Sequence, residues 1–155
     1  ILKLKPIFTT IHISGGDEMQ KISLSKNKNN KTTILGVTIL TSLDQKQTHK
    51  YYKEKNVNIL VKKFANYAKK NKLNGLVCSP LEINIVRKEV GKKMILVVPG
   101  IRPNKKHSSK KDDQKRTLTP KEAINLGADY LVIGRPIIES KNPLETIKKI
   151  NKSIQ

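Results

Sequence analysis

The arginines are the residues in this sequence most suited to binding an anionic ligand. There are four of them, Arg87, Arg102, Arg116 and Arg135, in a chain that carries 32 lysines and arginines in total. Three lie in the loop-like sequences PGIRP, DDQKR and IGRP. A planar guanidinium can bind two phosphate oxygens at once, which the ammonium group of lysine cannot do. These three positions therefore indicate a phosphate site, and ordinary surface arginines are the alternative.

The positive charge of the whole chain is a weaker signal. A net charge of +20 favours nucleic acid as a partner at first reading. However, lysine, isoleucine and asparagine make up 60 of the 155 residues, and A/T-rich codons encode all three. The lysines are dispersed, and an aromatic content of 4% is low for base stacking. A nucleic-acid-binding module is thus an unfavoured hypothesis.

The chain has no features of a membrane or secreted protein. No apolar run approaches the roughly 20 residues that span a bilayer, and the first residues lack a signal-peptide pattern. The one cysteine, Cys78, has no partner for a disulfide. We therefore expect a cytoplasmic protein without a membrane partner.

Five short apolar segments rich in β-branched residues predict five buried strands. Near-continuous apolar runs are typical of parallel strands that are covered on both faces. The predicted strands are Ile7–Ile13, Ile34–Leu40, Gly75–Cys78, Met94–Val98 and Tyr130–Ile133.

Helix starts follow a repeated pattern of a capping residue, a proline and then a glutamate two residues later. The pattern occurs at Ser79-Pro80, Thr119-Pro120 and Asn142-Pro143. Further helices are predicted over Asp17–Ser23, Asp44–Lys53 and Val57–Lys70, and polar loops over Ser25–Lys31 and Asn104–Lys111.

Alternating strands and helices indicate an α/β fold, either an open doubly wound sheet or a barrel. Five units cannot close an eight-stranded barrel by themselves. In either architecture the ligand-binding residues lie where the parallel strands end. A dinucleotide fingerprint is absent after the first strand, because Ser14-Gly15-Gly16-Asp17 is not GxGxxG.

The strand ends, taken in order, resemble orotidine 5'-phosphate decarboxylase of the bacterial type. The matching segments are HISGGDEM, GVTILTSL, GLVCSPLE, VVPGIRP, DDQKRTLTPKEA and DYLVIGRPI. The resemblance implies a partial TIM (β/α)8 barrel that forms one incomplete domain over residues 1–155. It also implies a reaction without cofactor that converts orotidine 5'-phosphate (OMP) to UMP and CO2, and a homodimer. A sugar-phosphate epimerase barrel is an alternative that the DDQKR segment disfavours.

The resemblance also implies roles for individual residues. Gln114, Gly134 and Arg135 would bind the 5'-phosphate, Arg102 would contact the substrate, and Thr41 would hydrogen-bond the pyrimidine ring. Two structural alternatives remain open at this stage. Arg102 could brace its own loop, and Thr41 could cap the following helix.

The catalytic charges of the family are not found in this chain. The resemblance implies an Asp-x-Lys-x-x-Asp motif that stabilises charge in the transition state, and Asp44–His49 lacks its final Asp. In the order of motifs that the resemblance implies, the missing strands would precede Ile7, and we expect no catalytic residue in this segment. The chain would then be a truncated, inactive part, or a gene remnant or split half that binds phosphate ligands or a complementary N-terminal half.

His12 and Cys78 lie at strand ends, but structural roles are expected for both. A packed, hydrogen-bonded histidine is favoured over a general acid or base at position 12. A buried thiol acting as a small hydrophobe is favoured at position 78.

Overall fold

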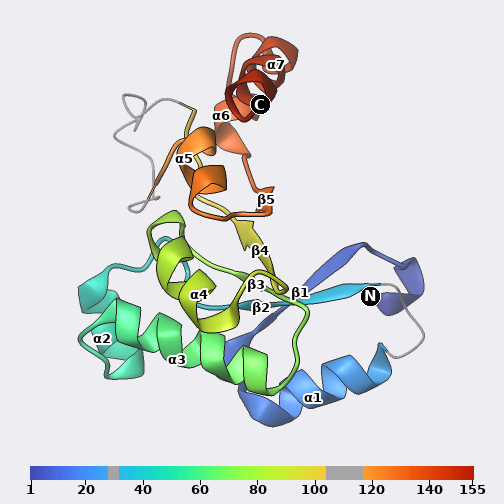
Figure 1. Ribbon diagram of the computed structural model, residues 1–155, viewed down its shortest axis with the longest axis vertical. Helices are drawn as coiled ribbons and strands as arrows, with labels where there is room; N and C mark the ends of the chain where they lie inside the picture. Colours follow the sequence, from blue (N-terminus) through green and yellow to red (C-terminus); the bar gives the residue numbers. More distant parts are fainter. Residues whose placement is uncertain (28–31, 104–116) are drawn as a thin grey trace.

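The protein forms one parallel sheet with helices between the strands (Figure 1). The computed structural model describes residues 1–27, 32–103 and 117–155. The strands are hydrogen-bonded in chain order, and every neighbouring pair is parallel. They are β1 (Phe8–His12), β2 (Thr33–Val37), β3 (Gly75–Val77), β4 (Ile95–Val98) and β5 (Tyr130–Leu131). The five predicted strands are thus confirmed in number and order.

Six helices follow the predicted order, and a seventh in the described residues, α6, was not predicted. They are α1 (Gly16–Lys26), α2 (Gln45–Tyr52), α3 (Val57–Lys70), α4 (Ile83–Val90), α5 (Pro120–Asn125), α6 (Arg135–Ile138) and α7 (Pro143–Ser153). Short 3₁₀ turns lie at η1 (Leu2–Leu4), η2 (Ile13–Gly15) and η3 (Pro80–Glu82). Within the described part of the chain, no helix has the length and apolar character needed to cross a membrane.

The three predicted helix starts with proline are confirmed. At α5, the backbone N–H of Thr119 donates to a carboxylate oxygen of Glu122 at 2.9 Å. At α7, the Asn142 side-chain oxygen accepts from the backbone N–H of Glu145 at 3.1 Å. The third start, at Pro80, opens as the 3₁₀ turn η3 and continues as α4.

Some predicted bounds were wrong by a few residues. β2 ends at Val37 instead of Leu40, because both the N–H and the Oγ1 of Thr38 donate to the Val77 carbonyl oxygen and the chain then turns. The loop predicted from Ser25 was also wrong at its start. Ser25 and Lys26 belong to α1, whose last turn includes a hydrogen bond from the Ser25 hydroxyl to the Ile22 carbonyl oxygen.

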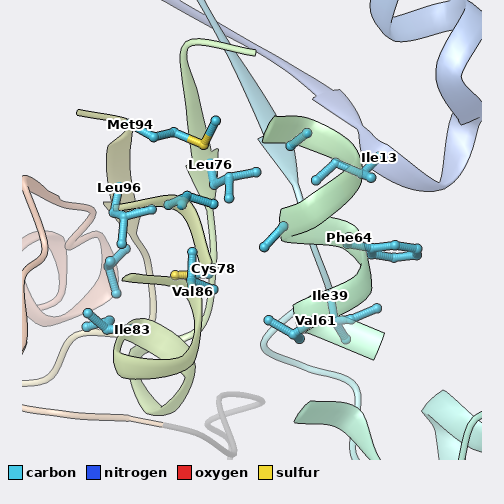
Figure 2. Close-up of a cluster of buried hydrophobic side chains, with 14 of the residues drawn as sticks. Ile13, Ile39, Val61, Phe64, Leu76, Cys78, Ile83, Val86, Met94 and Leu96 are labelled. Carbon is cyan, nitrogen blue, oxygen red and sulfur yellow. The ribbon is translucent and has the colours of Figure 1, made fainter. Parts of the chain in front are cut away.

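One face of the sheet packs against helices α3 and α4 and forms the core (Figure 2). Leu76 of β3 and Leu96 of β4 belong to this core, which also includes Val61 and Phe64 of α3 and Val86 of α4. Val61, Leu76, Val86 and Leu96 are fully buried, and Phe64 is nearly so. Full burial of such a side chain contributes about 1.5–3 kcal/mol. This helix-covered face therefore holds most of the hydrophobic stabilisation.

The sheet is curved toward the face that lies opposite helices α3 and α4. The rings of Phe8 on β1 and Tyr130 on β5 meet edge to face, with centroids 5.0 Å apart. These are the two edge strands, and in a flat sheet four spacings of about 4.8 Å would hold them roughly 19 Å apart. The sheet must therefore bend toward this face, as the wall of a barrel does. The contact favours the barrel over an open doubly wound sheet.

The expectation that all five strands are buried was wrong for the two edge strands. Each residue of β1 is exposed or only partly buried, and Tyr130 of β5 is 48% exposed. The central strands β2, β3 and β4 have buried residues, as expected. The difference arises because, within the described residues, an edge strand has a neighbour on one side only.

Arg87 of α4 joins the amino ends of two strands. Its guanidinium donates to the carbonyl oxygens of Gly91, Met94 and Gly127 at 2.6–3.0 Å, and it pairs with the Asp129 carboxylate at 2.6 Å. The same carboxylate oxygen of Asp129 accepts from the backbone N–H of Leu96 at 2.7 Å. Arg87 therefore fastens α4 to the segments that lead into β4 and β5.

Replacing Lys72 with glycine should stabilise the protein. Lys72 follows α3 with φ = 61°, a left-handed conformation that favours glycine, and Leu73 N–H bonds back to the Ala68 carbonyl oxygen, as in a Schellman motif. We expect the free energy of unfolding to rise by about 0.5–1 kcal/mol, measured by urea denaturation. The control is Lys63→Gly, an exposed position in the middle of α3, which should lower it by a similar amount. A loss of stability in Lys72→Gly would contradict this explanation.

Candidate functional site

The predicted site residues follow the carboxyl ends of neighbouring strands. Thr41 follows β2, Arg102 follows β4, and Gly134 and Arg135 follow β5. Since all strands are parallel, the segments after them lie along one edge of the sheet. This is the edge at which (β/α) barrels bind their ligands.

Thr41 does not cap the following helix. The N-cap of α2 is Asp44, whose carboxylate accepts from the backbone N–H of Gln47 at 2.9 Å, while the Gln47 side chain accepts from the Asp44 N–H at 3.1 Å. Thr41 is nevertheless buried. The capping alternative is therefore wrong, and a ligand contact by Thr41 stays a prediction.

Arg102 braces its own loop, as one alternative expected. Its backbone N–H donates to the Leu118 carbonyl oxygen at 2.9 Å, and one guanidinium nitrogen donates to the Ile101 carbonyl oxygen at 3.0 Å. Gly100, at φ = 78°, supplies the left-handed turn that leads into this segment. The side chain is buried at the carboxyl edge of the sheet. A guanidinium carries five N–H donors, so loop bracing and ligand binding are compatible roles.

Gly134 is not required by the packing around it. A Cβ placed on this residue would meet nothing within 4 Å, and its φ of −105° is open to other residues. Its carbonyl oxygen accepts from the N–H groups of Ile137 and Ile138, so Gly134 is the N-cap residue of α6, directly before Arg135. Open space beside a glycine at this edge allows a ligand to approach the backbone closely.

Ser79 is a polar residue at this edge that the sequence prediction treated only as a helix cap. Its backbone N–H donates to the Glu82 carboxylate at 3.2 Å, while the Glu82 N–H donates to the Ser79 carbonyl oxygen at 3.0 Å. The Ser79 hydroxyl is fully buried and faces the Glu82 backbone N–H in a capping-box arrangement, but it makes no hydrogen bond short enough to satisfy it. Buried hydroxyls without a full hydrogen bond are uncommon in protein interiors. Its place after β3, between the ends of β2 and β4, makes it a further candidate for ligand contact.

The expectations for the two other strand-end residues had different outcomes. Cys78 is buried within the hydrophobic core and forms no disulfide, as expected. His12 is exposed, so the prediction of a packed histidine was wrong. The reason is its place on the edge strand β1, whose alternate residues point away from the helices.

Gln114, Arg116 and the polar loop Asn104–Lys111 lie outside the described residues. Among the residues that are described, no group of three or more His, Cys, Asp or Glu side chains could hold a metal.

Two carboxylates on the outer helices, those of Glu89 and Glu145, have lowered pKa values. A hydrogen bond from Lys62 lowers the pKa of Glu89, with a smaller contribution from Asn66, and Lys149 lowers that of Glu145. Both belong to surface ion pairs and not to the carboxyl edge.

The parallel strands, the curved sheet and the polar residues at the strand ends define a protein of the (β/α)-barrel class. The model of the orotidine 5'-phosphate decarboxylase / HUMPS family matches residues 2–150. The chain belongs to this family.

Curated relatives and solved structures agree with this assignment. The chain is 48% identical over 145 residues to orotidine 5'-phosphate decarboxylase of Wolbachia pipientis subsp. Culex pipiens (strain wPip), covering 94% of this chain and 62% of that protein. It is 38% identical over 163 residues to the enzyme of that name from Dictyoglomus thermophilum, covering 100% of this chain and 66% of that protein.

The crystal structure of orotidine 5'-phosphate decarboxylase from Lactobacillus acidophilus superposes with a TM-score of 0.80 at 28% identity, covering 99% of this chain and 65% of that one. The chain thus spans 62–66% of the length of these three relatives, which is less than two thirds of each.

Proposed function

We propose that this chain carries the phosphate-binding and pyrimidine-binding part of an orotidine 5'-phosphate decarboxylase, the enzyme that converts OMP to UMP and CO2. The observation that carries the proposal is the family match over residues 2–150 together with relatives of that name at 38–48% identity. The arrangement of polar residues at one edge of the parallel sheet supports it.

In the proposed site, Gly134 and Arg135 bind the 5'-phosphate at the end of β5, with Gln114 as a further donor. The open space at Gly134 supports close contact of phosphate with the backbone. The Arg135 guanidinium can bind two phosphate oxygens. Arg102 and Thr41, both buried at the ends of β4 and β2, contact the rest of the nucleotide.

The proposed chemistry needs charges that these residues do not supply. Loss of CO2 from the pyrimidine leaves a carbanion, which must be stabilised and then protonated by preorganised charges. An Asp-x-Lys-x-x-Asp motif is absent from the 155 residues. We therefore propose that residues 1–155 form an incomplete barrel domain that binds the nucleotide, and that a complementary segment supplies the catalytic charges in a cytoplasmic enzyme.

The isolated 155-residue chain should bind UMP without decarboxylating OMP. Calorimetry should show UMP binding that inorganic phosphate weakens by competition, because the proposed contacts include those to phosphate. A spectrophotometric assay should show no loss of OMP above a control without protein, and the Wolbachia relative serves as the active control. Turnover by the chain alone would contradict the proposed division of roles, and an absence of UMP binding would contradict the binding site itself.

A further inference from the structure

A cavity lies between α4 and α5, at the amino ends of β4 and β5 (Figure 1). Its volume is about 620 Å³, which is within the range of about 300–1,000 Å³ that is typical of small-molecule sites. Residues of both helices line it, together with Lys92 before β4 and residues 126–129 before β5. The candidate nucleotide site follows the carboxyl ends of the strands, so this cavity lies at the opposite edge of the sheet. We call it the amino-edge cavity.

Arg87 lines the amino-edge cavity with all the donors of its guanidinium in use. A guanidinium has five N–H donors, and those of Arg87 form five hydrogen bonds of 2.6–3.0 Å. The acceptors are the carbonyl oxygens of Gly91, Met94 and Gly127, the last of these twice, and the carboxylate of Asp129. No donor is left to bind an anion in the plane of the group. What Arg87 offers a ligand is therefore the flat face of the guanidinium, which stacks on aromatic rings.

Two lysines add positive charge to the amino-edge cavity. Lys88 of α4 and Lys92, which follows that helix, are both exposed, and neither belongs to an ion pair of the described residues. Among the described residues that line the cavity, Asp129 carries the one carboxylate, and it is paired with Arg87 at 2.6 Å. Three cations against one carboxylate favour a ligand with an anionic group.

Apolar and amide side chains complete the lining. Ile124 and Leu126 are partly buried and pack against the hydrophobic core, so they present a fixed apolar wall. Asn84 and Asn125 are exposed, and their amides can donate to and accept from the edge of a ring. Apolar walls with a few polar groups are typical of a site for an organic molecule and not for a bare ion.

We propose that the amino-edge cavity binds a purine nucleotide. Its base stacks on the guanidinium face of Arg87, and its phosphate is held by Lys88 and Lys92. A purine is favoured over a pyrimidine because two fused rings offer a larger surface for stacking. The inference goes beyond the proposed function, since none of these residues follows the carboxyl end of a strand.

The test titrates the 155-residue chain with AMP in a calorimeter and compares two partial ligands. AMP should bind at least about tenfold more tightly than adenosine, which lacks the phosphate, and than ribose 5-phosphate, which lacks the base. Equal affinity for AMP and ribose 5-phosphate would overturn the stacking, and equal affinity for AMP and adenosine would overturn the role of the lysines.

The double variant Lys88→Ala/Lys92→Ala should weaken AMP binding by about tenfold, because it removes both charged contacts to phosphate. The matched control is Lys70→Ala/Lys93→Ala, which changes the net charge equally at two exposed lysines outside the cavity lining. It should bind AMP as the original chain does, and thermal unfolding should show that both double variants remain folded. Equal weakening by the two would assign the affinity to the overall charge and would overturn the site.

The stacking on Arg87 has a readout of its own in nuclear magnetic resonance. The chain has four arginines, so the Nε–H of Arg87 gives one of four signals. Lysine variants of the other three identify it by exclusion. AMP should shift this signal upfield through the ring current of the base, and ribose 5-phosphate should not. An unshifted Arg87 signal at saturating AMP would contradict the stacking.

A variant of the carboxyl-edge site separates this inference from the proposed function. Arg135→Ala should bind AMP with the affinity of the original chain. A loss of AMP binding in that variant would place AMP at the carboxyl edge, and no binding at millimolar AMP would remove the site altogether. Either result would overturn the amino-edge site, whereas a failure of UMP binding bears on the proposed function alone.

Discussion

Replacing Arg87 with methionine should lower the free energy of unfolding by about 2–4 kcal/mol. Methionine keeps much of the apolar stem but removes the guanidinium that donates to three backbone carbonyl oxygens and to Asp129. Those acceptors would lose their partners at the junction of α4 with the starts of β4 and β5. Urea denaturation monitored by circular dichroism measures the change.

Two further variants separate the hydrogen bonds of Arg87 from its charge. Arg87→Lys retains the charge but not the planar set of donors, so it should recover only a small part of the loss. Lys88→Met, at the exposed neighbouring position on α4, should change the stability by less than about 0.5 kcal/mol. A full recovery by lysine would show that the charge alone matters and would contradict the bracing role.

The second large effect is expected at the proposed phosphate site. Arg135→Ala should weaken UMP binding by roughly ten- to a hundredfold, since a hydrogen bond to a charged group contributes about 1.5–3 kcal/mol. The affinity of Arg135→Lys for UMP should lie between that of Arg135→Ala and that of the original chain. Lysine keeps the positive charge but lacks the planar set of N–H donors. Isothermal titration calorimetry measures both affinities.

The control for this site is Lys141→Ala, an exposed cation shortly after α6. It should bind UMP as the original chain does, and thermal unfolding should show that all three variants remain folded. If the alanine variants at positions 135 and 141 weakened binding equally, the positive field of the chain and not a specific site would explain the affinity.

Helix starts that depend on hydrogen bonds between residues close in the sequence were predictable. The starts of α5 and α7 depend on side chains and backbone groups within three residues of each other, such as Thr119 with Glu122 and Asn142 with Glu145. The composition and order of the apolar segments were sufficient to predict the five parallel strands. The alternation of strands and helices also predicted that Arg102 follows β4.

The features that depend on distant neighbours were not predictable in this way. An apolar segment predicts a buried strand whatever the position of that strand in the sheet. The exposure of β1 and of Tyr130 depends instead on their positions at the two edges of the sheet. His12 was misjudged for the same reason. The role of Arg87 depends on Gly127 and Asp129, which lie far along the chain.

The contact between Phe8 and Tyr130 has a consequence for the order in which the molecule is made. One ring lies on β1 and the other on β5, so the pair cannot form until β5 has left the ribosome. Domains that depend on such long-range contacts fold slowly, because the chain must close a large loop first. During synthesis the ring of Phe8 must therefore wait for its partner while β2, β3 and β4 are made.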